Sequence, residues 1–373
     1  MRISVTGHSI ISPYSWNTGA FHEIEQGISN VKLNTESKIS PINTYVSRIN
    51  DLHFSSIDIK NHTRLESMMI QAIKDACIEA KVDLKNGNTI LIISTTKGNI
   101  DLLEGDNYKG FDKKRTYLSE LSNQLKSYFN AKHQPVLVSN ACISGGAAIE
   151  LGRDLLLSKR YQNVVVCGGD IVSEFVVSGF RSFHALSEGK SKPYDKNRDG
   201  INLGEAASAL IISNETKSEI SLLTAVTRND ANHISGPSRT GEGLFLAVQS
   251  ALEQANLKAE NIDYISAHGT ATIFNDEMES IAFSRCNLNH APLNSYKGYL
   301  GHTLGAAGVI ESVLAILCLK NNRLIKSLGY SDHGVSEKLN VIQKTESKEL
   351  NYILKTGSGF GGGNNALIFG KDP

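Results

Sequence analysis

Short apolar runs alternate along this chain with segments of helical periodicity. The runs that predict strands are residues 89–94, 135–140, 163–169, 207–213, 262–268 and 351–357. Because polar residues do not alternate with apolar ones in these runs, we expect strands that are buried on both faces, in largely parallel sheets. Residues 64–80 and 243–255 place apolar side chains at helical spacing, which predicts amphipathic helices. The alternation of the two patterns indicates an α/β fold.

Two segments of the chain resemble each other. CISGGAAIELGRDLLL begins at Cys142, and GHTLGAAGVIESVLAIL begins at Gly301. Each is a turn followed by Gly and Ala, a glutamate, and then Leu and Ile. One interpretation is a single sheet with two unrelated, tightly packed helices. We favour the other, in which residues 1–213 and 214–373 form two similar halves, each with a buried central helix, joined without a low-complexity linker.

Composition narrows the class of protein and its location. Lys plus Arg and Asp plus Glu both number 38, so no net charge attracts nucleic acid or a membrane surface. The start, MRISVTGHSI, lacks the apolar core of a signal peptide, and we expect no apolar run long enough to span a bilayer. Five widely spread cysteines favour a reducing cytoplasm over a disulfide framework, and the sequence has no short His/Cys cluster typical of a metal site.

Cys142 is the first candidate for chemistry. It follows an expected strand and enters a helix rich in Gly and Ala. At the first turn of a helix, unpaired N–H groups and the helix dipole would lower the pKa of the thiol and favour a nucleophilic thiolate. The alternative is a buried structural cysteine, which is the commoner role of an isolated Cys.

Two histidines are the next candidates. His268 ends an expected strand, where α/β folds place chemistry, and Asp276 and Glu279 follow in the next expected helix. Lys297 shortly precedes His302, and a nearby lysine would hold an imidazole neutral, so that the ring can donate a hydrogen bond to a carbonyl. The alternatives are a loop histidine with a helix-capping carboxylate, and a surface lysine with a capping histidine.

The segment KTGSGFGGGNNALIFG matches the G-x-G-x-x-G pattern of dinucleotide-binding folds. We reject that interpretation because an expected strand, rather than a helix, follows the glycines. A glycine-rich hairpin that brings backbone N–H groups to a reacting centre fits better than a plain turn, since a plain turn does not need five glycines.

Four segments stand in a recognisable order: NACISGG, AHGTATIFND, KGYLGHTLGAAG and GFGGGN. Together with SKPYDKNRDGINLGEAASALII, they resemble the motifs of the beta-ketoacyl-acyl-carrier-protein synthases of the thiolase superfamily, in particular the elongating Cys-His-His class. The likeness covers nearly the whole chain. It implies a thiolase fold, an α/β architecture of two pseudo-duplicated αβαβα halves with stacked sheets.

The resemblance also implies a reaction and a set of roles. The reaction is decarboxylative Claisen condensation in fatty acid, polyketide or polyene biosynthesis, with substrates carried on the phosphopantetheine of acyl carrier protein and without a further cofactor or metal. Cys142 would hold the acyl chain as a thioester, and the N–H groups of Cys142 and Phe360 would form the oxyanion hole. His268 and His302 would stabilise the malonyl enolate, and Lys297 would tune both histidines.

Further residues match supporting positions of the family. Glu311, Asp276 and Glu279 correspond to acidic residues around the site. A basic rim is expected to dock the acidic carrier protein. The docking candidates are Lys60, Arg64, Lys190 and Lys192.

Details within the superfamily favour elongation chemistry. Ser358 stands in the final glycine motif, where degradative thiolases carry a second cysteine, and His302 stands where chain-initiating enzymes carry an asparagine. The segment after Lys97 is unlike the usual acyl-pocket sequence, which leaves the acyl group open. A starter-unit acyltransferase or synthase and a chain-length-determining partner subunit stay as alternatives, and so do a homodimer and a heterodimer.

Overall fold

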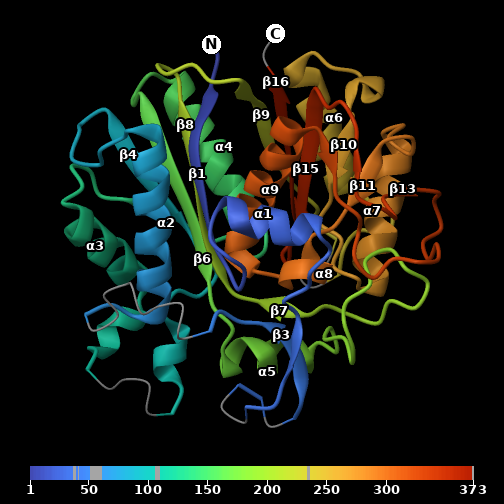
Figure 1. Ribbon diagram of the computed structural model, residues 1–373, viewed down its shortest axis with the longest axis horizontal. Coiled ribbons are helices and arrows are strands. Elements are labelled where there is room, and N and C mark those ends of the chain that lie inside the picture. Colours follow the sequence, from blue (N-terminus) through green and yellow to red (C-terminus); the bar gives the residue numbers. More distant parts are fainter. Residues whose placement is uncertain (37–38, 41, 51–60, 106–109, 233–235, 372–373) are drawn as a thin grey trace.

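The computed structural model describes residues 1–36, 39–40, 42–50, 61–105, 110–232 and 236–371. The described chain forms five layers, in which two sheets face each other across a central pair of helices and further helices cover each outer face (Figure 1). This is the α/β thiolase architecture that the sequence predicts. The two sheets follow one after the other along the chain.

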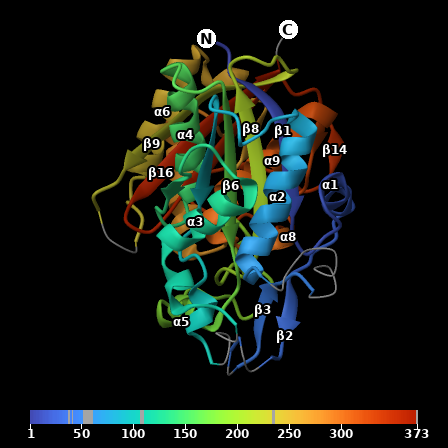
Figure 2. The same cartoon turned by 90° about the vertical axis from the view of Figure 1, so that its left-hand side faces the viewer.

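The N-terminal sheet runs in the order β5–β4–β6–β8–β1. Its strands are β1 (Ser4–Ile11), β4 (Thr89–Ser94), β5 (Val136–Val138), β6 (Asn163–Asp170) and β8 (Ala206–Ser213). The first three strands in this order are parallel, whereas β8 is antiparallel to both of its neighbours. Helices α2 (Arg64–Ala80) and α3 (Leu118–Phe129) cover the outer face (Figure 2).

The C-terminal sheet runs in the order β9–β16–β15–β10–β11–β13. Its strands are β9 (Ile220–Asn229), β10 (Tyr264–Ser266), β11 (Pro292–Asn294), β13 (Asn340–Val341), β15 (Tyr352–Ser358) and β16 (Gly363–Lys371). The strand β16 is antiparallel to β9 and β15, and the rest of the sheet is parallel. Helices α6 (Glu242–Ala255) and α7 (Ile273–Arg285) cover its outer face.

The two sheets repeat one connectivity. The N-terminal sheet has five strands, and the C-terminal sheet has five when its outermost strand, β13, is left out. If these strands are numbered 1 to 5 along the chain in each sheet, both sheets have the order 3-2-4-5-1 from the outer edge to the junction. At the junction, β1 and β9 pair through Ser4 and Ser221. The repeat supports an internal duplication, and the boundary between residues 213 and 214, which falls in the connection from β8 to β9, stays a prediction.

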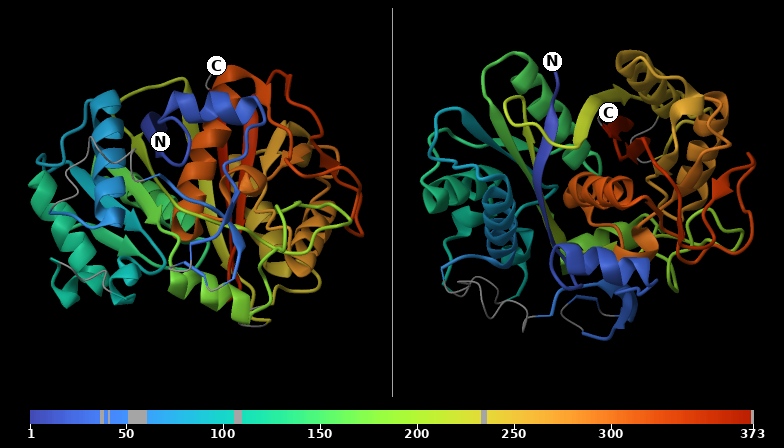
Figure 3. Two further views of the ribbon diagram at one scale, coloured as in Figure 1. Left: turned by 60° about the horizontal axis from the view of Figure 1, so that its bottom comes forward. Right: turned by 45° about the horizontal axis from the view of Figure 1, so that its top comes forward.

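The middle layer consists of α4 (Ser144–Leu157) and α9 (Ala307–Asn321), which both pack against strands of the two sheets (Figure 3). Glycines let their backbones approach closely. A Cβ added at Gly308 would lie 2.3 Å from the backbone nitrogen of Gly146, and one added at Gly145 would lie 2.7 Å from that of Val309. The small residues that the two similar segments share therefore form the crossing of the central helices.

Smaller elements complete the described chain. They are α1 (Thr18–Glu25), β2 (Lys32–Asn34), β3 (Thr44–Ser47), α5 (Glu174–Ser182), β7 (Leu203–Gly204), α8 (Lys297–Leu300), β12 (Arg323–Leu324) and β14 (Glu346–Ser347). The strands β2, β3 and β7 form a small separate sheet, and β12 pairs with β14. In Figure 1 the small sheet and α5 lie below the central layer.

Two expectations about the sheets are wrong. The sheets are mixed rather than largely parallel, because antiparallel strands lie on both sides of the junction. Helices cover both faces of both sheets, so strands of either direction carry continuous apolar runs. The outer strand β5 is also not fully buried, since Val136 is 37% exposed. It is the edge strand of the sheet, so within the described chain it pairs with only one neighbour, β4.

The expectation about membrane-spanning segments also needs a correction. Among the described residues, the helical stretch Leu304–Asn321 is long and apolar enough to cross a membrane by length and composition, and 83% of it is buried inside the protein. A helix that packs between two sheets meets protein on all sides, which explains why it is apolar all round.

Candidate active site

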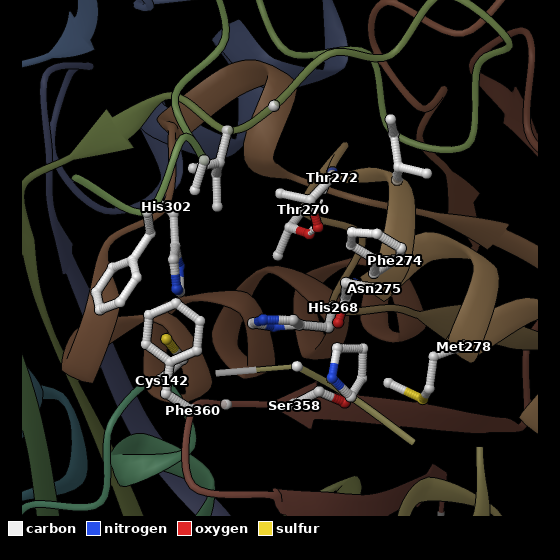
Figure 4. Close-up of a pocket in the computed structure, with 18 of the residues that line it drawn as sticks. Cys142, His268, Thr270, Thr272, Phe274, Asn275, Met278, His302, Ser358 and Phe360 are labelled. Carbon is white, nitrogen blue, oxygen red and sulfur yellow. Dashed lines mark hydrogen bonds between the residues drawn. The ribbon is translucent and has the colours of Figure 1, made fainter. Parts of the chain in front are cut away.

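A cavity of about 420 Å³ is lined by residues from both halves of the chain. Cys142 reaches it from the N-terminal half, and His268 and His302 reach it from the C-terminal half (Figure 4). The aromatic rings of Phe180 and Phe360 form part of its wall. The three side chains that the sequence predicts to act together therefore meet in one place.

Cys142 lies in the turn between β5 and α4, just before the helix begins. Ala141 next to it has a φ of 44°, in the left-handed region that L-residues rarely adopt. The backbone N–H of Phe360 faces the sulfur as a hydrogen-bond donor. Although Cys142 stays partly accessible through the cavity, protein surrounds its sulfur, and this burial raises the pKa of the thiol to about 11 despite the charges of Lys297 and Lys97. The expected lowering by a helix terminus is therefore wrong, because desolvation is the larger effect.

His268 follows β10, and Gly269 turns the chain with a φ of 46°. The carboxylate of Glu279, on α7, accepts hydrogen bonds from the backbone N–H of His268 at 2.9 Å and of Gly269 at 2.7 Å. Burial, followed by the charge of Lys297, holds the pKa of His268 well below its usual value. The ring is therefore neutral near pH 7.

Asp276 supports the same loop from α7. Its carboxylate accepts hydrogen bonds from the backbone N–H of Tyr194 at 2.7 Å and of Ala271 at 3.2 Å, and the Tyr194 hydroxyl donates to Glu279 at 3.0 Å. Burial and the nearby charge of Glu279 raise the pKa of Asp276 to about 7. Neither carboxylate lines the cavity, so both hold the His268 loop in place from behind.

His302 follows Gly301 and leads into α9. Its ring centre lies 5.3 Å from that of His268, and the two ring planes are nearly perpendicular, at 86°. Burial, followed by the charge of Lys297, lowers the pKa of His302 well below its usual value. Among the described residues, neither ring nitrogen of His302 has a hydrogen-bond partner although both are buried. Because an unpaired buried polar atom is costly, these nitrogens are suited to bind a polar atom of a ligand.

Lys297, on α8, is fully buried behind the two imidazoles. Its Nζ donates hydrogen bonds to Glu311 Oε1 and to the backbone oxygen of His268, both at 2.7 Å, and lies 3.5 Å from His268 Nδ1. Lys355, on β15, lies 2.8 Å from Glu311 Oε2. Burial opposes the ionisation of Glu311, but the two lysines outweigh it and lower the pKa of the carboxyl group.

The glycine-rich segment forms the antiparallel hairpin of β15 and β16, as the sequence predicts. A Cβ added at Gly359 would lie 3.2 Å from the backbone nitrogen of Cys142. The hairpin therefore packs closely against the turn that carries the cysteine, and it brings the N–H of Phe360 there. Because a strand follows the glycines, this segment does not form a dinucleotide-binding turn.

The sequence analysis does not identify two buried charged residues near the site. Lys355 interrupts the apolar run at residues 351–357, and Asp170 ends the run that forms β6. Asp170 accepts hydrogen bonds from the backbone N–H of Gly305 at 2.7 Å and of Thr96 at 2.9 Å, so it joins the two halves beside the cavity. The available signal was a charged residue within, or directly after, an expected buried strand.

Phe180 also escaped the sequence analysis. Its ring, on α5, stacks on that of Phe360 with ring centres 5.9 Å apart, and it lies 6.5 Å from the ring of His302. Nothing in the local sequence of α5 points to this contact, because it depends on how two distant segments pack together.

The predicted docking residues fall into three groups. Lys60 lies outside the described residues. Arg64 forms an ion pair with the buried carboxylate of Glu205, so its role within the described structure is internal. Lys190 and Lys192 are exposed, on the loop that also supplies residues to the cavity wall.

Metal-binding groups are the remaining candidates for chemistry. Within the part of the chain that the structure describes, no group of three or more His, Cys, Asp or Glu side chains is placed to hold a metal ion. The prediction that the protein uses no metal stays a prediction.

Comparison with known families gives a consistent match. The sequence model "Beta-ketoacyl synthase, N-terminal domain" matches residues 3–218, and "Beta-ketoacyl synthase, C-terminal domain" matches residues 221–331. The 3-oxoacyl-[acyl-carrier-protein] synthase 2 of Rhizobium meliloti is 32% identical over an alignment of 251 residues that covers 62% of this chain and 59% of that protein. The alignment thus spans less than two thirds of the relative's length.

Two further similarities bear on the site and the fold. A polyketide biosynthesis malonyl-ACP decarboxylase of Bacillus subtilis is 36% identical over an alignment of 188 residues that covers 48% of this chain and 45% of that protein. A chain from the complex of a ketosynthase with its chain length factor from Xenorhabdus doucetiae superposes with a TM-score of 0.89 at 23% identity, and the match covers 100% of this chain and 98% of that chain. At that identity, the likeness extends to the fold.

Proposed function

This chain belongs to the beta-ketoacyl synthase family, and we propose that it condenses an acyl group with a malonyl group carried on acyl carrier protein, releasing carbon dioxide and forming a 3-ketoacyl product. The observation that carries the proposal is the meeting of the Cys142 thiol with two neutral imidazoles, His268 and His302, in one cavity. A nucleophile that can store an acyl group and two hydrogen-bond donors for an enolate are what this chemistry requires.

In the first half-reaction, Cys142 takes the acyl group. Because its pKa is raised to about 11, the resting thiol is protonated at neutral pH and needs a base when it attacks. A neutral imidazole nitrogen of His302 can accept that proton. The N–H groups of Cys142 and Phe360 stabilise the oxyanion formed at the thioester carbon. The phosphopantetheine sulfur then leaves with the proton, and the acyl-Cys142 thioester remains.

In the second half-reaction, the malonyl thioester loses carbon dioxide. The Lys297 ammonium can only donate hydrogen bonds, so its place beside His268 Nδ1 favours the tautomer with the proton on Nε2. The imidazoles of His268 and His302 donate to the thioester oxygen as the electrons of the broken carbon–carbon bond form an enolate. The enolate carbon attacks the thioester carbon of acyl-Cys142, the carbon–sulfur bond breaks, and the released thiolate takes up a proton from solvent.

Partners follow from the same proposal. Acyl carrier protein would deliver both substrates on phosphopantetheine, which makes a resident cofactor unnecessary. The exposed Lys190 and Lys192, close to the cavity wall, are our candidates for contact with that acidic protein. The Xenorhabdus ketosynthase is paired with a chain length factor, and we propose that this chain forms a dimer in the cytoplasm, either with itself or with such a subunit.

A second candidate is decarboxylation without condensation. It is favoured by the similarity to the Bacillus malonyl-ACP decarboxylase. The two imidazoles alone suffice for that step, which would supply an acetyl starter unit. The retained Cys142 favours condensation, because decarboxylation alone needs no acyl store.

One experiment separates these functions. The protein is incubated with acyl carrier protein loaded with an acyl group and then with malonyl carrier protein, and both proteins are analysed by mass spectrometry. An acyl adduct on Cys142 followed by a carrier-bound product two carbons longer supports condensation. Decarboxylated malonyl carrier without elongation supports the second candidate. An adduct without elongation indicates a starter-unit acyltransferase, and no reaction at all indicates a non-catalytic partner subunit.

A further inference from the structure

The residue Lys355 has no role in the reaction described so far, although it is buried behind the cavity, next to Glu311. It lies on β15 and is 1% exposed. Placing a lysine there removes a strongly hydrated ammonium group from water, which is costly unless the charge has a partner. Its partner is Glu311, the carboxylate that also holds Lys297.

The three side chains form a compact bridge. Lys297 Nζ lies 2.7 Å from Glu311 Oε1, and Lys355 Nζ lies 2.8 Å from Glu311 Oε2, so each carboxylate oxygen has its own ammonium. Lys355 Nζ also donates to the backbone oxygen of Thr356, which leads into the glycine-rich hairpin. Because the carboxylate is held from both sides, the Lys297 ammonium is held against His268.

The bridge has an unbalanced charge when both lysines are protonated, because two ammonium groups and one carboxylate leave one net positive charge behind the two imidazoles. Burial lowers the pKa of Lys355, and the neighbouring carboxylate of Glu311 opposes that shift. The charged groups that face Lys355 from the neighbouring elements are Glu311 on α9, Lys297 on α8 and Glu279 on α7. Glu279 is already engaged by the His268 loop, and its pKa is raised by burial despite the hydrogen bonds that it accepts.

We propose that Lys355 is a positioning residue of the condensing site: through Glu311 it holds Lys297 against His268, and it adds a positive charge behind the two imidazoles. The role of Lys355 in catalysis rests on the proposed function. The charge effect itself is a property of the resting protein. The charge of Lys355 acts on the pKa of both rings in the lowering direction. Burial and Lys297 have larger effects on each ring, and so do His302 on the pKa of His268 and Lys97 on the pKa of His302.

The test therefore begins without substrate. In protein labelled with ¹⁵N-histidine, ring resonances of His268 and His302, assigned with the variants His268→Gln and His302→Gln, are followed as the pH is lowered. In Lys355→Met, Glu311 keeps Lys297 as its partner, but the net positive charge is lost. We expect both rings to take up protons at a higher pH, by less than about one unit, because Lys355 is the smallest of the charges that act on each ring. Identical titrations in Lys355→Met and the unsubstituted protein would overturn the proposal.

Two further variants separate charge from packing. The double variant Lys355→Met/Glu311→Gln has the original net charge, because one cation and one anion are removed together, so its titration should return toward that of the unsubstituted protein. Lys344→Met removes the same charge from a side chain that is 82% exposed and should leave both rings unchanged. If the double variant titrates like Lys355→Met, the effect comes from repacking and the proposal fails.

The pH dependence of catalysis provides an independent second measurement. The acid limb of acyl transfer to Cys142 should move to higher pH in Lys355→Met, because a protonated His302 ring has no free nitrogen to accept the thiol proton. If the unsubstituted protein releases no carbon dioxide while the ring titrations shift as expected, the proposed function fails and the role of Lys355 stands. If decarboxylation proceeds but neither the titrations nor the acid limb move, only the role of Lys355 fails.

Discussion

At the scale of single residues, burial decides the protonation states of the site. The same desolvation raises the pKa of Cys142 and lowers those of His268 and His302, since in each case it favours the uncharged form. The resting cavity therefore holds a thiol and two neutral imidazoles. This state leaves both rings ready to accept or donate one hydrogen bond.

Substitution of Cys142 should abolish acyl transfer and leave the decarboxylation of malonyl carrier protein. In Cys142→Ala, we expect no acyl adduct by mass spectrometry, while malonyl-carrier decarboxylation continues, because the two imidazoles that act on the malonyl group remain. Cys286→Ala is the matched control, since that thiol lies outside the cavity and should leave both steps unchanged. An acyl adduct that persists in Cys142→Ala would place the acyl store on another residue.

The pH dependence of decarboxylation follows from the lowered pKa values of the two histidines. An ordinary histidine, with a pKa near 6.5, would lose the neutral ring as the pH falls through that value. Because both rings have pKa values well below it, we expect the initial rate of carbon dioxide release to stay nearly constant between about pH 8 and pH 6. A fall to half the maximal rate at about pH 6.5 would show that the rings titrate normally.

At the scale of elements, the crossing of α4 and α9 sets the position of the chemistry. Cys142 precedes one of these helices and His302 precedes the other, so the separation of the helices determines how far apart the two groups lie. Glycine at the crossing permits backbone contact that a side chain would prevent. The Gly/Ala motifs of the two halves therefore allow the two helices to pack closely, and this packing places Cys142 and His302 near each other.

A methyl group at the crossing should be destabilising. Gly308→Ala would place a Cβ 2.3 Å from the nitrogen of Gly146, so a backbone must move, and we expect a loss of about 1–3 kcal/mol in the free energy of unfolding measured with urea. Gly179→Ala in α5 is the control, because an added Cβ there meets none of the described atoms within 4 Å. It should be neutral or stabilising by about 1 kcal/mol or less. Equal effects of the two substitutions would show that the crossing tolerates the methyl group.

At the scale of the whole molecule, the two halves share one middle layer. Each central helix packs against strands of both sheets, and the cavity takes its residues from both halves. Neither half can bury its central helix alone. The division into similar halves thus describes the connectivity, whereas the folded unit is the whole chain.

Unfolding should accordingly be cooperative across the junction. Trp16 is the chain's one tryptophan and packs in the N-terminal half, so its fluorescence reports on that half, while circular dichroism reports on helices of both. We expect the two signals to change at the same urea concentration, because the halves lose their shared layer together. Separate midpoints would indicate halves that are stable independently.

The sequence by itself determined the type of six strands and two helices, the order of the motifs and the identity of the thiol and the two histidines. The helix at residues 64–80 and the strand at 89–94 match their predicted bounds, because the spacing of apolar residues is a local signal. The turn motifs around Cys142 and His302 are local too. The direction of the strands could not be predicted in this way, because an apolar run indicates that a strand is buried but does not indicate whether it pairs in parallel or antiparallel.

The tertiary structure alone decided the direction of the Cys142 pKa, the pairing of Lys355 with Glu311 and the stacking of Phe180 on Phe360. Each depends on which distant segments come together and how much water they exclude. A helix terminus stabilises a thiolate in either case, but only the assembled cavity shows that desolvation outweighs it. A lysine within a strand indicates that a partner is needed, and only the folded chain supplies its position.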